Sequence, residues 1–101
     1  MKGLTQIQLI ALSDCLLKLS SREVPVPSFF GYIHRAVCDE VKIKVDKKLA
    51  AGTMPKNGVT ISLSRAQYIF LMDVNRSQLL SHEVEFRNGL TRLLQYNQKK
   101  L

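Results

Sequence analysis

Residues 64–74, SRAQYIFLMDV, carry the clearest helix-start signal in this chain of 101 residues. Ser64 is a favourable N-cap, Gln67 lies three residues on, and Leu63 and Tyr68 occupy the two positions of a hydrophobic staple. The pattern predicts a helix that begins directly after Ser64. Apolar residues follow on nearly every side of its first turns, so we expect neighbours to cover it on more than one face. It is therefore predicted to be the central helix of one small core.

A second cap follows that helix at once. Asn75 stands three residues before Gln78, as in a capping box, and the spacing predicts a final helix over about 76–97. A glycine inside a helix costs about 1 kcal/mol relative to alanine. Either this final helix is broken at Gly89, or another backbone approaches Gly89 closely.

The N-terminal helix, predicted over about 5–21, opens with the same signal, because Thr5 and Gln8 repeat the capping box. At 100° per residue, one face of this helix is apolar and belongs to the core. That face comprises Leu9, Leu12, Cys15, Leu16 and Leu19. Ile10 and Leu17 form a second, thin apolar stripe on the otherwise polar side, and this stripe indicates either contact with another protein chain or a second contact within the chain itself.

Two structures compete for the middle of the chain. Residues 41–46 and 59–63 alternate apolar and polar side chains with period two, which favours a β-hairpin formed by 41–46 and 58–63. The other structure is a helix over about 28–51, ended by lysines in its last turn and by Gly52. A hairpin would need a loop of about a dozen residues, which is longer than hairpins usually use. We therefore favour the helix, with 59–63 as a short extended segment.

These segments predict an all-α fold, a compact four-helix domain over residues 1–101 with a frayed tail at about 97–101. The alternative is an α+β fold containing the 41–46/58–63 hairpin. The length suits one domain.

No apolar run approaches the ~20 residues that cross a bilayer, so no membrane partner is expected. Two distant cysteines form no disulfide framework, which predicts a cytoplasmic protein. The sequence leaves open whether two copies of the chain form a homodimer.

The charge balance indicates anionic partners, because fifteen Lys and Arg against eight Asp and Glu give a net charge of +7. Nucleic acid and acidic proteins both meet this description. Two basic groups could contact phosphates. They comprise Lys42, Lys44, Lys47, Lys48 and Lys56 in the first group, and Arg87, Arg92, Lys99 and Lys100 in the second.

Residues 59–63, followed by two helices, resemble a ribbon-helix-helix DNA-binding unit. The resemblance covers under half of the chain and rests on the pattern of elements. It implies a dimer whose paired strands enter the major groove, with Thr60 and Ser62 as the side chains that read the bases.

No sequence motif indicates catalysis, because nucleophile-elbow and phosphate-binding glycine patterns are absent. The chain's Cys and His residues would make one Cys2His2 set, comprising Cys15, His34, Cys38 and His82. Without a Cys-x-x-Cys pair we interpret the cysteines as buried structural thiols and expect no metal and no cofactor.

We expect a small basic non-enzymatic binding protein, most simply a regulatory, accessory or inhibitory factor that docks on a larger protein machine. Direct DNA or RNA binding is the alternative.

Overall fold

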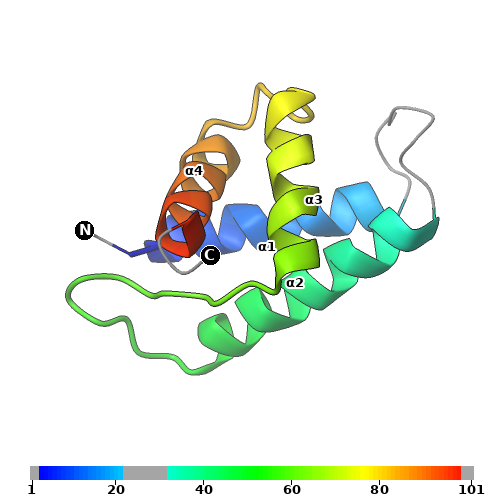
Figure 1. The fold of residues 1–101 in the computed structure, drawn as a ribbon. Coiled ribbons are helices and arrows are strands. Elements are labelled where there is room, and N and C mark those ends of the chain that lie inside the picture. Colours follow the sequence, from blue (N-terminus) through cyan, green and yellow to red (C-terminus); the bar gives the residue numbers. More distant parts are fainter. Residues whose placement is uncertain (1–2, 22–31, 99–101) are drawn as a thin grey trace.

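The computed structural model describes residues 3–21 and 32–98, and this part of the chain forms four α-helices (Figure 1). They are α1 (Gln6–Ser20), α2 (Tyr32–Ala50), α3 (Arg65–Arg76) and α4 (Val84–Gln98). The predicted all-α four-helix fold is confirmed. The helix start predicted near residue 28 lies outside the described residues.

The α+β alternative is wrong, because residues 41–46 lie inside α2. Val41 and Val45 are fully buried, whereas Ile43, which a strand would place on the same face, is 56 % exposed, as helical spacing requires. Gly52, with φ +76°, follows the end of α2 and donates its N–H to the carbonyl of Leu49. Glycine adopts this left-handed conformation without the steric cost of a Cβ.

The helices form two layers, with α1 and α2 side by side and α3 and α4 standing across them (Figure 1). The most extensive contacts are those of α1, with α2 and with α4. Leu9, Leu16 and Leu19 of α1 are completely buried. By contrast, α3 packs less extensively, against α4 and α2. The prediction that α3 is the central helix is therefore wrong, and α1 holds that place.

The connection between α3 and α4 also differs from the prediction. α3 continues through Arg76, and α4 begins only at Val84, so Asn75 does not cap a new helix. The chain turns through left-handed backbone at Gln78 and Leu80, with φ values of 58° and 55°. This turn carries α4 back onto α1, and a helix running on from residue 76 would not follow that path.

The extended segment 59–63 is tied down by polar groups. Leu4 and Val59 exchange both backbone N–H···O=C bonds, at 2.7 and 2.9 Å. The Asn97 amide then accepts from the Leu63 N–H at 2.8 Å and donates to the Ile61 carbonyl at 2.9 Å. Asn97 is 1 % exposed. The fraying predicted from residue 97 therefore does not begin there, and residues 99–101 lie outside the described residues.

Gly89 lies in an unbroken α4, at the place where this helix crosses α1. A Cβ at Gly89 would lie 3.2 Å from Cβ of Gln8 and 3.3 Å from Cγ of Leu12. Of the two explanations that the sequence left open, the helix break is wrong. The close approach is real, but it is made by side chains of α1.

Candidate binding surfaces

An exposed apolar surface covers the outer side of the α1–α2 pair. Ile10 and Leu17 of α1 are 53 % and 45 % exposed, and Ile43 of α2 is 56 % exposed. Ser13 Oγ donates to Asp46 Oδ1 at 2.6 Å and joins the two helices at this surface. Ile10 and Leu17 stand one turn to either side of Ser13, and Ile43 stands one turn before Asp46, so all three share one face. We call these three aliphatic residues the hairpin face, after the pair of packed helices, α1 and α2, on which they lie.

The charged neighbours of the hairpin face are partly neutralised within the chain. Lys42 Nζ lies 2.6 Å from Asp46 Oδ2. Partial burial alone would raise the pKa of Asp46, but hydrogen bonds from Lys42 and Ser13, together with the lysine's charge, lower it below 3.8. The face therefore presents aliphatic side chains beside a compensated ion pair. Such a face loses little solvation when a partner covers it.

Three further predicted phosphate contacts are engaged inside the fold. Lys44 Nζ donates to the Ser62 carbonyl at 2.9 Å and to Gln67 Oε1 at 2.8 Å. Arg92 Nη1 donates to the Gly3 carbonyl at 3.0 Å, and Arg87 Nη2 to the Asn75 carbonyl at 3.3 Å. These three cations bond to the extended segment at Ser62, to the last turn of α3 at Asn75 and to Gly3 near the N-terminus.

Lys47, Lys48 and Lys56 are exposed and form no ion pair within the described part of the chain. Two neighbouring cavities of about 360 and 270 Å³ lie between the end of α2 and the extended segment, and Lys47 borders the larger of them. Lys48 and Ala51 line both cavities. We call this pair of cavities the lysine groove.

Thr60 and Ser62, the side chains expected to read bases, are exposed on the extended segment. Both line the lysine groove, Ser62 in the larger cavity and Thr60 in the smaller. Neither the N–H nor the carbonyl of Thr60 has a hydrogen-bond partner among the described residues. The extended segment is no regular strand, since its bridge to Leu4 is isolated. The structure thus brings Thr60 and Ser62 together with Lys44, Lys47 and Lys48, whereas Arg87 and Arg92 belong to other parts of the fold.

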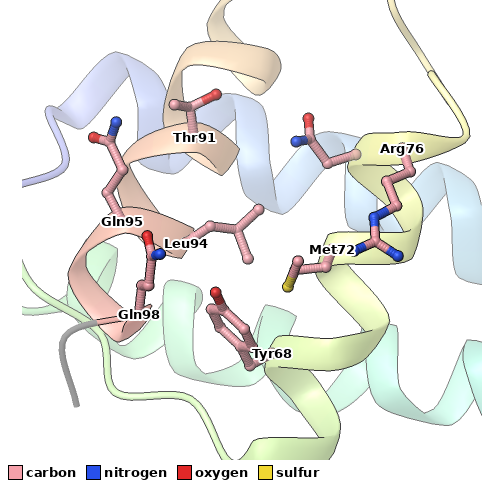
Figure 2. Close-up of a pocket in the computed structure, with 8 residues that line it drawn as sticks. Tyr68, Met72, Arg76, Thr91, Leu94, Gln95 and Gln98 are labelled. Atoms are coloured by element: carbon pink, nitrogen blue, oxygen red, sulfur yellow. The ribbon is translucent and has the colours of Figure 1, made fainter. Parts of the chain in front are cut away.

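A third surface lies between α3 and α4. This cavity of about 260 Å³ has an apolar centre, and Figure 2 shows Tyr68, Met72 and Leu94 pointing toward one another there. The Arg76 side chain stands at one end, and Gln95 and Gln98 stand on the opposite wall (Figure 2). We call it the α3–α4 groove.

The cysteines lie in the core. Cys15 is 1 % exposed and Cys38 is fully buried. Burial, followed by the charges of Glu83 and Asp14, raises the pKa of Cys15 to about 11. Burial, followed by the charge of Asp39, raises the pKa of Cys38 to about 12. Both are protonated thiols at neutral pH. Within residues 3–21 and 32–98, no group of three or more Cys, His, Asp or Glu side chains is placed to hold a metal ion.

Sequence reasoning missed Ile43 and the lysine groove. The alternation at 41–46 placed Ile43 with Val41 and Val45, as in a strand. In a helix Ile43 lies about 200° from each of them, because successive residues turn by about 100°. Once a helix was favoured, this spacing already separated Ile43 from the buried pair. The groove carried no local signal, because it forms between segments distant in sequence.

Comparison with known protein families, with curated proteins and with solved structures finds no match. None of the helices in the described ranges is both long and apolar enough to cross a membrane.

Proposed function

We propose that this chain is a protein-binding module that docks the hairpin face on an acidic partner protein, as an accessory or inhibitory factor would. The observation that carries the proposal is the cluster of Ile10, Leu17 and Ile43 on one face, each at least 45 % exposed. Ile7, 63 % exposed, precedes Ile10 by one turn of α1. Exposed aliphatic side chains on the outer side of two packed helices are typical of the apolar centre of a protein interface.

The chemistry of the partner follows from the charge around this face. The chain carries a net charge of +7, and Lys47 stands one turn beyond Ile43 on α2. An acidic surface around an apolar patch would complement this arrangement and would speed association. Nucleic acid draws less support from the structure, because Lys42, Lys44, Arg87 and Arg92 all bond to groups of the chain itself.

The test is capture of partners by the protein carrying a photo-reactive phenylalanine analogue in place of Ile10. The captured protein is then titrated calorimetrically against the unmodified chain and its variants. Leu17→Asp and Ile43→Asp should each weaken binding by about tenfold or more, since a carboxylate would be buried in an apolar interface. Their far-UV circular dichroism should match that of the unmodified protein, because both positions are exposed.

The matched control is Gln95→Asp, which places the same charge on the exposed wall of the α3–α4 groove. It should leave the affinity unchanged. If Gln95→Asp weakens binding while Leu17→Asp and Ile43→Asp do not, the docking surface is the α3–α4 groove and the proposal is wrong.

A further inference from the structure

The lysine groove has a wall of unpaired backbone. Along the extended segment, the backbone groups of Val59 pair with Leu4, and the Ile61 carbonyl and Leu63 N–H pair with Asn97. These three residues turn their bonded groups to one edge. In an extended chain the intervening residues, Thr60 and Ser62, turn their N–H and C=O to the opposite edge. The Ser62 carbonyl on that edge accepts from Lys44 Nζ. The N–H and C=O of Thr60 have no partner in the described chain.

The opposite wall of the lysine groove is cationic. Lys47 and Lys48 lie in the last turn of α2 and are exposed. Lys44 closes one end, because its Nζ crosses from α2 to the Ser62 carbonyl at 2.9 Å. Ala51 and Ile61 are the apolar residues of the larger cavity. The groove therefore combines a free backbone edge, an apolar floor and two cations that make no ion pair in the described chain.

We infer that the lysine groove binds an extended acidic peptide segment of a partner protein, by adding one strand to the edge at Thr60. The peptide's carbonyl accepts from the Thr60 N–H, and its N–H donates to the Thr60 carbonyl. Its side chains alternate between the two faces. Apolar side chains therefore meet Ala51 and Ile61, while carboxylates reach Lys47 and Lys48. Main-chain bonds supply affinity in this mode of recognition, and the side chains supply specificity.

The groove favours a peptide over a single-stranded nucleic acid. Proteins that bind single strands stack the bases on aromatic side chains. No residue lining either cavity is aromatic. The chain's own C-terminal residues, Lys99-Lys100-Leu101, carry the same sign of charge as the groove and would be repelled by it.

This inference deepens the proposed function by naming the chemistry of a second contact, and the two surfaces meet at Lys47, one turn from Ile43. It is tested separately. The probe is a fluorescein-labelled hexapeptide in which glutamate and valine alternate, titrated by fluorescence anisotropy at about 50 mM salt. A Kd of about 100 µM or tighter is expected, which is the range of small transient contacts.

Two protein variants locate the charge contacts. The double variant Lys47→Glu, Lys48→Glu should weaken peptide binding by about tenfold or more, because each lysine becomes a repelling carboxylate. Its matched control is Arg65→Glu, Arg76→Glu, which changes the net charge equally at exposed positions of α3. The peptide affinity of the control should fall by less than about threefold, because only the long-range electrostatic attraction changes and salt partly screens it.

Two further changes test the backbone pairing. Thr60→Pro removes an N–H that bonds to nothing in the described chain, so the fold should persist while peptide affinity falls by about fivefold or more. Thr60→Val keeps the N–H and should bind as the unmodified protein does. N-methylation of the peptide's central residues should also abolish binding, and this change cannot affect folding of the protein.

Other occupants give distinct outcomes. Tighter binding of decathymidylate than of the peptide would overturn the inference and assign the lysines to phosphate. A dimer in sedimentation that Thr60→Pro dissociates, with no peptide binding to the unmodified protein, would assign the groove to a second copy of the chain and would also overturn the inference. Equal binding of the N-methylated peptide, or no saturable binding below about 1 mM, would also overturn it. Leu17→Asp adds one negative charge outside the groove and should lower peptide affinity by less than about threefold, as the charge control does, so failure of the groove leaves the hairpin face to its own test.

Discussion

The helices α1 and α3 both begin with a capping box, but they differ in the contacts that hold them in the fold. In each helix, the N-cap side chain accepts a hydrogen bond from the backbone N–H of the glutamine three residues on. The side-chain carbonyl of that glutamine in turn accepts from the backbone N–H of the N-cap residue. The pairs are Thr5 with Gln8 in α1 and Ser64 with Gln67 in α3. Both helices then bury an apolar face, which in α3 comprises Phe70, Leu71 and Val74, but α3 packs less extensively than α1. The Gln67 amide also accepts from Lys44 at 2.8 Å and donates to Glu40 at 3.0 Å. A cap fixes where a helix starts, and the surface beyond it decides where the helix lies.

The largest effect should come from an aliphatic truncation in α1. Leu16→Ala should lower the free energy of unfolding by about 3 kcal/mol, because Leu16 is completely buried and its loss leaves a cavity. Ile69→Ala in α3 should change it by less than about 0.5 kcal/mol, since Ile69 is half exposed. Urea unfolding followed by far-UV circular dichroism measures both. A loss at Ile69 as large as that at Leu16 would mean that α3 is covered in solution, and the contrast would fail.

The next effect concerns the polar anchor of the segment that leads into α3. Asn97→Ala should destabilise the fold by about 2 kcal/mol, because it leaves the buried Leu63 N–H and Ile61 carbonyl without partners. Amide exchange at Leu63 should accelerate more than exchange within α1. Gln98→Ala is the control, since Gln98 is exposed in the same turn of α4. A neutral Asn97→Ala would show that α3 does not depend on this anchor.

A smaller effect separates the two caps. Gln8→Ala and Gln67→Ala each remove one reciprocal capping bond, which contributes about 1 kcal/mol in a typical cap. Gln67→Ala also removes the links to Lys44 and Glu40 and should cost up to about 1 kcal/mol more. Thermal unfolding of the two variants in parallel measures the difference. Equal losses would show that α3's cross-links to α2 contribute nothing to stability.

The parts of this fold that were predictable from sequence are those governed by local chemistry. Both capping boxes were visible because their residues are three positions apart. The end of α2 was visible because Gly52 follows a lysine-rich last turn. The α3–α4 turn was not, since Gln78 and Leu80 are residues that rarely adopt left-handed backbone. The Gln78 N–H donates to the Asn75 carbonyl, and Leu80 packs against the core.

The candidate surfaces divide in the same way. The exposed stripe of Ile10 and Leu17 could be predicted from helical spacing within one element. The partners of Lys44, Arg87 and Arg92 lie from 12 to 89 residues away in sequence. No local pattern reports such bonds. A count of basic residues therefore overestimated the cationic surface available to a partner.

The smallest effect tests whether α1 also has a polar fastening, through Ser13 and Asp46. The folded pKa of Asp46 lies below its ordinary value of 3.8, so its carboxylate adds stability above that pH. The contribution fades as the pH falls through the folded pKa. Because the carboxyl is 43 % exposed, solvent screening limits it to roughly a few tenths of a kcal/mol. The unmodified protein and Asp46→Asn should differ in unfolding free energy at pH 6 and converge as the pH falls below 3.8. A difference that persists undiminished in acid would show that the ionised carboxylate is not what joins α1 to α2.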